Sequence, residues 1–207
     1  MFITFEGLDF CGKSTQIKLL KSHLENENKK VKLIREPGGT SISEKIRDIL
    51  LDNKNDEMKF ETELLLFSAS RAQLVREVII PALEAGVYVL SDRFHDSSIA
   101  YQGFGRGVNI DRLMQIQNFA IGQAIPDLTF FIDIPLEEIE KRKVKIKGVE
   151  LDRIEVSNSD FYRKVREGYL NLTKSETRFR RIDGTESIEK IHIKILNILE
   201  KYINTTS

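Results

Sequence analysis

Short apolar runs alternate with longer segments of helical periodicity along the whole chain. The apolar runs predict β-strands at residues 2–6, 31–35, 87–91, 128–133 and 178–182. The remaining segments repeat their apolar residues every three or four positions, which predicts helices near 13–27, 41–51, 59–85, 109–122, 135–145, 158–173 and 186–203. This alternation predicts an α/β fold in which a five-stranded parallel sheet carries helices on both faces.

The chain is predicted to form a single domain over residues 1–207. This length suits one domain with an ample core, and the sequence contains no internal repeat, low-complexity tract or linker. Open parallel sheets bind ligands beyond the carboxyl ends of their strands. The residues directly after each predicted strand are therefore the first candidates for function.

A phosphate-binding loop follows the first predicted strand. It reads Gly7, Leu8, Asp9, Phe10, Cys11, Gly12, Lys13, Ser14 and Thr15, a complete G-x-x-x-x-G-K-[ST] pattern. The two pattern glycines allow backbone N–H groups to surround a β-phosphate, Lys13 reaches the β and γ oxygens, and Ser14 offers its hydroxyl to Mg²⁺. The helix predicted to begin near Lys13 adds the positive end of its dipole. The sequence therefore predicts a nucleoside triphosphate site.

Charge and cysteine content exclude several other classes of protein. Lysines plus arginines number 32, as do aspartates plus glutamates, so no overall basic field is expected to attract nucleic acid or a membrane surface. No apolar stretch approaches the roughly 20 residues that a membrane helix needs. The only cysteine, Cys11, cannot form an internal disulfide, and the N-terminus shows neither a basic leader nor an apolar signal segment. We expect a cytoplasmic protein with no nucleic-acid or membrane partner.

A second candidate group follows the third predicted strand. Asp92 can hold Mg²⁺ through water, and the adjacent Arg93 can bridge phosphates. An Asp-Arg pair alone is equally typical of a structural ion pair. Combined with the phosphate-binding loop, it resembles a Walker-B-like partner.

A third candidate group lies within the long helical segment. Phe67 and Arg71 are four residues apart and so share one helix face. An aromatic ring beside a guanidinium suits a base that stacks and accepts hydrogen bonds. The alternative is a core phenylalanine next to a solvated arginine.

Together these motifs resemble the thymidylate kinase family over nearly the whole chain. The matching blocks are, in order, residues 6–15, 35–40, 65–73, 92–93, 97–103, 151–155 and 181–184. The resemblance implies the fold of P-loop nucleoside monophosphate kinases, with a lid segment at about 141–156. It also implies transfer of the ATP γ-phosphoryl group to dTMP, giving dTDP, with Mg²⁺ and in a homodimer. ATP would be held by residues 7–15 and by Asp183 and Gly184, and Mg²⁺ by Ser14 and Asp92.

The resemblance also assigns the base and sugar of the acceptor dTMP to particular side chains. Phe67 matches the residue that stacks on thymine, and Arg71 matches the contact to its carbonyl edge. Ser98 and Gln102 match polar contacts to the base. Tyr101 matches the aromatic residue that packs on the sugar and leaves no room for a 2′-hydroxyl.

The phosphate end of the acceptor site is implied in the same way. Arg47 and Arg93 match arginines that hold the acceptor phosphate, and Pro37 belongs to the same pocket. Asp9 and Glu36 also line that pocket. Carboxylates near phosphates require a partner, so we expect these two to contact the sugar 3′-hydroxyl, Mg²⁺ or an arginine.

The loop departs from part of the family at Phe10, where some members carry an arginine that reaches the transferring phosphoryl group. Another cation must then replace it. The predicted lid offers Lys141, Arg142, Lys143, Lys145, Lys147 and Arg153, around Gly148. Most of these lysines are typical of a solvated helix face, whereas Arg153 belongs to a Leu-Asp-Arg motif. The predicted catalytic residues are Lys13, Arg93 and Arg153, as in the bacterial-type branch with a lid arginine.

Two other functions share some of these motifs. A GTP-binding switch would need Asn-Lys-x-Asp after a strand; residues 53–56 match the letters, but no predicted strand precedes them. A deoxynucleoside kinase would use a similar loop and Asp-Arg pair on an uncharged acceptor. Arg47 and Arg93 favour a charged monophosphate instead.

Overall fold

The architecture is a five-stranded parallel sheet, in a computed structural model that describes residues 1–145, 152–154 and 158–206. The strands are β1 (Phe2–Glu6), β2 (Val31–Arg35), β3 (Tyr88–Asp92), β4 (Leu128–Asp133) and β5 (Phe179–Asp183). They lie in the order β2-β3-β1-β4-β5, and every neighbouring pair is parallel. The predicted α/β fold is confirmed, with each strand within a residue or two of its expected place.

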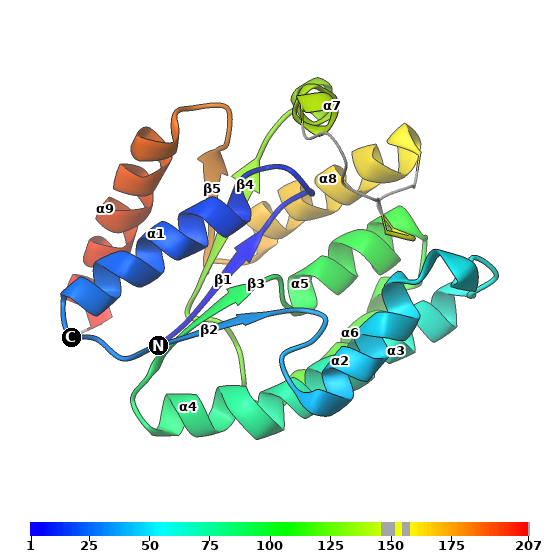
Figure 1. The fold of residues 1–207 in the computed structure, drawn as a ribbon, viewed down its shortest axis with the longest axis horizontal. Helices are drawn as coiled ribbons and strands as arrows, with labels where there is room; N and C mark the ends of the chain where they lie inside the picture. Colours follow the sequence, from blue (N-terminus) through cyan, green and yellow to red (C-terminus); the bar gives the residue numbers. More distant parts are fainter. Residues whose placement is uncertain (146–151, 155–157, 207) are drawn as a thin grey trace.

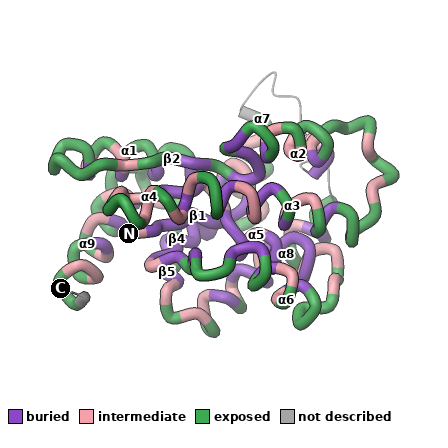
Figure 2. Tube along the Cα trace, turned by 90° about the horizontal axis from the view of Figure 1, so that it is seen from below, coloured by how far each residue is buried: buried purple, intermediate pink, exposed green. Residues whose placement is uncertain are grey.

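Helices cover both faces of this sheet (Figure 1). The two helices α1 (Lys13–Asn26) and α9 (Ile188–Thr206) pack against each other on one side. On the other side, α4 (Ile80–Glu84) packs on β3 and α8 (Ser159–Ser175) packs on β4 and β5. Figure 2 shows the buried positions concentrated on the strands and on the inward sides of these helices.

A second group of helices lies near the carboxyl ends of β2 and β3. They are α2 (Ser41–Leu51), the short turn η1 (Asn53–Asn55), α3 (Phe60–Leu74), its continuation η2 (Val75–Ile79), α5 (His95–Ser98), η3 (Ile99–Gly105) and α6 (Ile110–Ile121). Thr40 begins α2 by accepting a hydrogen bond from the Ser43 backbone, which satisfies a free N–H group of the first turn.

The π-helical segment η3 was not predicted from the sequence. Gly103 and Gly105 interrupt the helical pattern there, and neighbouring helices pack closely against both glycines. A Cβ atom at Gly105 would lie 2.6 Å from the Phe161 ring of α8, and one at Gly103 would lie 2.5 Å from Ile110.

The predicted lid is described only in part. Helix α7 (Leu136–Lys145) and residues 152–154 are described, whereas 146–151 and 155–157, including Lys147 and Gly148, lie outside the described residues. Within the described part of the chain, no helix combines the length and apolar character needed to cross a bilayer.

Candidate active site

A cleft of about 680 Å³ lies at the carboxyl ends of β1, β2 and β3. Its walls come from the phosphate-binding loop, the turns after β2 and β3, and helices α2, α3, η3 and α7. The cleft brings together most of the predicted site residues: Asp9, Phe10, Gly12, Lys13, Ser14, Thr15, Glu36, Pro37, Arg47, Phe67, Arg71, Asp92, Arg93, Ser98, Tyr101 and Gln102. Residues far apart in the sequence therefore share one site.

The phosphate-binding loop has the backbone shape that its glycines predict. Gly7 has a φ of 139°, and a Cβ atom there would lie 2.5 Å from the carbonyl oxygen of Ile132, so only glycine fits. Lys13 Nζ donates to the carbonyls of Gly7 and Leu8 at 3.1 and 3.0 Å, which holds its charge over the loop. Leu8 and Cys11 are buried beneath it.

The two predicted magnesium ligands lie in direct contact. Ser14 Oγ donates to Asp92 Oδ2 at 2.9 Å, and both residues line the cleft. A hydroxyl and a carboxylate are hard oxygen ligands of the kind that Mg²⁺ takes. Among the described residues, no group of three or more acidic, histidine or cysteine side chains is placed to hold a metal ion. Two protein ligands suit Mg²⁺, because Mg²⁺ in nucleotide sites keeps several waters and also binds phosphate oxygens of the substrate.

Arg93 is held in the cleft on two sides. Its NH2 group forms an ion pair with Asp9 Oδ1 at 2.6 Å and donates to the Tyr101 hydroxyl at 3.1 Å. Its NH1 group donates to Ser97 Oγ and to the Tyr169 hydroxyl, both at 3.2 Å. Burial by itself would raise the pKa of Asp9, but the charges of Arg93 and Lys13 outweigh it and hold that pKa below its usual value. The expected arginine partner of Asp9 is thus Arg93.

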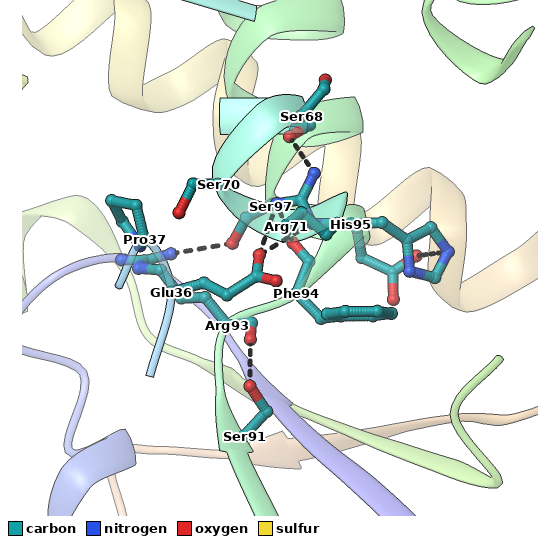
Figure 3. Close-up of polar contacts among 12 residues, drawn as sticks. Glu36, Pro37, Ser68, Ser70, Arg71, Ser91, Arg93, Phe94, His95 and Ser97 are labelled. Atoms are coloured by element: carbon teal, nitrogen blue, oxygen red, sulfur yellow. Dashed lines mark hydrogen bonds and ion pairs between the residues drawn. The ribbon is translucent and has the colours of Figure 1, made fainter. Parts of the chain in front are cut away.

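Glu36 finds its partner in Arg71, at the other end of the cleft. Arg71 is only 1% exposed, and its guanidinium lies 2.6 Å from Glu36 Oε2 (Figure 3). The same guanidinium donates to Ser98 Oγ at 2.9 Å and to the Phe94 carbonyl at 3.1 Å. A solvated arginine, the alternative interpretation of this position, is therefore wrong. Phe67, one turn earlier on α3, is half-buried and lines the cleft.

Arg47 enters the cleft from α2. Its NH1 group donates to the Pro37 carbonyl at 2.8 Å, and Arg35 donates to the same oxygen at 2.9 Å. Burial, and then the neighbouring Arg35 charge, lower the pKa of Arg47 from its usual value. Two guanidinium groups beside one backbone turn form a local positive region in a chain of zero net charge.

Comparison with known proteins identifies the family of the chain. The thymidylate kinase family model matches residues 5–195. The chain belongs to the thymidylate kinase family. It is 48% identical over 203 residues to thymidylate kinase of Thermoanaerobacter sp. (strain X514), covering 98% of each chain. It is 49% identical to that of Thermosipho africanus (strain TCF52B), covering 99% of this chain and 100% of the other. A crystal structure of thymidylate kinase from Ehrlichia chaffeensis has a TM-score of 0.78 and 34% identity, covering 97% of this chain and 98% of that one.

One predicted member of the thymidylate kinase site lies elsewhere. Arg153 is buried against α2 and α3, where its Nε donates to the Leu50 carbonyl at 2.9 Å and its NH2 lies 2.7 Å from Glu63 Oε2. Its neighbours Asp152 and Ile154 line the cleft, but Arg153 is not among the lining residues. The buried Glu63 carboxylate requires a cation, which accounts for this placement.

Among the described residues of the predicted lid, Arg142 of α7 reaches the phosphate-binding loop. Its NH1 group donates to the Cys11 carbonyl at 3.2 Å, and its NH2 group donates to the Gly184 carbonyl at 2.8 Å. Arg142 therefore joins the loop to the turn after β5, where Asp183 accepts a hydrogen bond from the Thr185 backbone at 2.9 Å. Asp183 itself is exposed and does not line the cleft.

Sequence reasoning missed three residues that hold the thymidylate kinase site in shape. Glu63 lies four residues before Phe67 and accepts from Gln102 Nε2 at 2.9 Å, so the spacing of 63, 67 and 71 on one helix face was an available signal. Ser97 and Tyr169 both contact Arg93. No local pattern marks Tyr169, because its partners are distant in the sequence.

Proposed function

We propose that this protein transfers the γ-phosphoryl group of ATP to dTMP, giving dTDP and ADP. The observation that best supports this proposal is one cleft that joins a phosphate-binding loop to an arginine-rich pocket through Arg93. A phosphate oxygen of dTMP attacks the γ-phosphorus while the bond from that phosphorus to the ADP oxygen breaks. Catalysis of such a step consists chiefly of positioning and of charge stabilisation.

The donor nucleotide is proposed to lie along residues 7–15. The loop N–H groups and the start of α1 face the β-phosphate, and Lys13 balances charge on the β and γ oxygens. Arg142 and the backbone of Asp183 and Gly184 lie where the adenine end would extend. Ser14 and Asp92 would hold Mg²⁺, which supplies positive charge to the phosphate oxygens when it is bound.

The acceptor is proposed to lie between α3 and η3. Phe67 stacks on the thymine, while Arg71, Ser98 and Gln102 provide its polar contacts. Tyr101, buried beside Arg93, leaves no room for a ribose 2′-hydroxyl.

The sugar and phosphate ends complete this proposal. Glu36 Oε1 is buried and accepts no hydrogen bond from the described residues, so it can accept one from the 3′-hydroxyl. Arg47 and Arg93, next to Pro37 and Asp9, are assigned to the acceptor phosphate. Arg93 and Lys13 are the proposed catalytic cations.

The alternatives fit the site less well. The Asn-Lys-x-Asp letters fall on the exposed turn η1 and do not line the cleft, as a guanine-binding motif would. A deoxynucleoside kinase would have no use for two arginines at the acceptor phosphate.

A homodimer is proposed to form through α3 and α6. These helices pack side by side and expose Leu65, Ile110 and Phe119, the last with 81% of its surface accessible. Exposed large apolar side chains on two adjacent helices support this face as the interface. Phe119→Glu is expected to yield monomers in sedimentation analysis, and an unchanged sedimentation coefficient would exclude this face.

We also propose a cytoplasmic location, in keeping with the single, unpaired thiol of Cys11.

The proposed function is tested by ADP release with dTMP, dUMP, UMP, dCMP, AMP and thymidine as acceptors. We expect dTMP to give the highest kcat/KM and thymidine to give almost no turnover. Preference for thymidine would indicate a nucleoside kinase, and ADP release that is independent of any acceptor would indicate an ATPase.

A further inference from the structure

A buried carboxylate lies directly behind the phosphate-binding loop. Glu6 ends β1 and is 0% exposed. Its Oε1 accepts from the Phe94 backbone at 2.8 Å, and its Oε2 accepts from Ser97 Oγ at 2.6 Å and from the Tyr169 hydroxyl at 2.8 Å. Glu6 therefore connects β1, the turn after β3 and helix α8.

Both of these hydroxyl groups also contact Arg93. Arg93 NH1 donates to Ser97 Oγ and to the Tyr169 hydroxyl at 3.2 Å, on the side opposite Asp9. Among the described residues, Glu6 forms no hydrogen bond with Arg93 itself. Its influence on the guanidinium passes through the two hydroxyls.

The protons in this cluster make the arrangement depend on the charge of Glu6. A hydroxyl has one proton and two lone pairs, and an ionised carboxylate can only accept. When Glu6 is ionised, Ser97 and Tyr169 both point their protons at it and turn their lone pairs towards Arg93. A neutral Glu6 donates a proton of its own to one hydroxyl, which then no longer donates to Glu6. Ser97 Oγ and the Tyr169 hydroxyl lie 2.9 Å apart, so the displaced proton turns towards the other hydroxyl, and the carboxylate no longer orients both lone pairs towards Arg93.

The backbone of Arg93 depends on the same carboxylate. Arg93 has a φ of 71°, in the left-handed region that is uncommon for residues other than glycine. The bond from the Phe94 N–H group to Glu6 follows this residue directly, and Ser91 Oγ donates to the Arg93 carbonyl at 2.6 Å (Figure 3). Glu6 thus fixes both the turn and the side chain of Arg93.

We propose that Glu6 is a positioning residue for phosphoryl transfer, which holds Arg93 against the acceptor phosphate through the Ser97 and Tyr169 hydroxyls. The inference rests on the proposed function, because it takes the Arg93 guanidinium as the group that contacts that phosphate. Glu6 does not touch the substrate.

The groups around Glu6 place its pKa close to neutral pH. Burial, followed by the charge of Asp96 on α5, raises the pKa of Glu6 to about 7, although Arg93, Ser97 and Tyr169 act in the opposite direction. Arg178, just before β5, pairs with Asp96 at 2.7 Å and so offsets part of that charge. The ionised form of Glu6 is the competent one, so its contribution to activity increases as the pH rises through about 7.

The test compares Glu6→Gln with the unchanged protein between pH 6 and 8.5. The glutamine amide has the same shape but carries no negative charge, and it can donate towards a hydroxyl. At pH 8 we expect kcat to fall at least about tenfold and the KM for dTMP to rise, with the KM for ATP changed less than about twofold. The ratio of kcat of the unchanged protein to kcat of Glu6→Gln should shrink towards pH 6, where Glu6 of the unchanged protein is also neutral. This ratio cancels the titration of the dTMP phosphate.

Two further variants keep the test informative if Glu6→Gln folds poorly. Tyr169→Phe removes one bridging hydroxyl. It should also lower kcat and raise the KM for dTMP with little change in the KM for ATP, but by smaller factors than Glu6→Gln. Combined with Glu6→Gln, it should add little to the effect of the single change, because both remove one connection. Asp96→Asn is the matched control: it neutralises an equally buried carboxylate that pairs with Arg178, and it should leave the KM for dTMP near its original value at pH 8.

The proposal is overturned if Glu6→Gln keeps full kcat/KM at pH 8. It is equally overturned if the loss is the same at every pH and affects the KM for ATP and dTMP alike. These outcomes require that the unchanged protein phosphorylates dTMP. If it does not, the proposed function fails first, and the two failures are distinguishable.

Discussion

Lys13 and Arg93 are the cations closest to the proposed path of the phosphoryl group, and each is held by named acceptors. Lys13 Nζ lies over the loop on two backbone carbonyls, while Arg93 lies between Asp9 and two hydroxyls. Both side chains are thus oriented by groups of the protein itself. Orientation of this kind lowers the reorganisation needed in the transition state.

Replacing Lys13 by alanine should abolish most phosphoryl transfer. We expect kcat to fall more than about a hundredfold, the scale for loss of one electrostatic contact in the transition state. The melting temperature should change little, since Lys13 bonds only to the loop itself. Lys21→Ala on the same helix, where Lys21 pairs with exposed Glu25, is the control and should keep full activity. Near-normal turnover of Lys13→Ala would contradict the kinase assignment.

Tyr101 should decide whether a ribose is accepted. Tyr101→Ala is expected to reduce the preference for dUMP over UMP at least about tenfold, because it opens space beside the sugar. Tyr101→Phe keeps the ring and removes only the hydroxyl that contacts Arg93 and Asp9. It should preserve the preference, and an equal loss in both variants would place sugar selection elsewhere.

At the scale of whole elements, the sheet and most helices could be predicted from periodicity, whereas η3 could not. Residues 99–105 carry two glycines and no clear helical pattern, yet they form a widened helix that supplies Tyr101 and Gln102. Their conformation is set by α6 and α8, which pack against the two glycines. The motif residues were identifiable individually, but the element that presents them depends on tertiary contacts.

The direction in which each lid arginine points could not be predicted from the sequence either. Arg142 and Arg153 both looked like candidate lid cations, and the Leu-Asp-Arg motif favoured Arg153. The structure pairs Arg153 with Glu63 and extends Arg142 to the phosphate-binding loop. Which arginine turns towards which partner depends on Glu63, a carboxylate that lies 90 positions before Arg153 (153 − 63).

This difference between the two arginines can be measured. Arg142→Ala should lower kcat about tenfold or more and raise the KM for ATP, because the residue bridges the loop and the turn after β5. Arg153→Ala removes the closer of the two arginines that pair with the buried Glu63, at 2.7 Å against 3.5 Å for Arg106, so it should lower the melting temperature more than Arg142→Ala does.

A second substitution separates the two arginines further. Phe10→Arg should partly restore kcat to Arg142→Ala, since it places a guanidinium back on the loop. A larger loss of kcat in Arg153→Ala, restored by Phe10→Arg, would support the catalytic role that the sequence predicts for Arg153.

At the scale of the whole molecule, two buried groups give stability opposite pH dependences. The pKa of Glu6 is raised to about 7, so the folded protein binds more protons than the unfolded chain below that pH, and Glu6 costs stability as the pH rises from about 4.3 to about 7. Burial lowers the pKa of His95 to about 4, so His95 costs stability as the pH falls from about 6.5 to about 4.

Thermal melting of Glu6→Gln isolates the first of these effects. Relative to the unchanged protein, its melting temperature should rise by several degrees between pH 5 and pH 8, because glutamine has no proton to lose. The scale follows from about 1.4 kcal/mol per pKa unit as an upper bound and about 2–4 °C per kcal/mol for a domain of this size. A constant difference across this range would show that Glu6 keeps an ordinary pKa.

In the proposed function, one cleft binds both ATP and dTMP and transfers the γ-phosphoryl group between them. The most direct measurement follows ³²P from γ-labelled ATP into separated products, with dTMP and thymidine as competing acceptors and Lys13→Ala as the inactive control. We expect the label to appear in dTDP, with kcat/KM for dTMP at least about 10³ times that for thymidine, because Arg47 and Arg93 bind a phosphate that thymidine lacks. Label that accumulates in dTMP formed from thymidine, or in free phosphate, would contradict the proposed function.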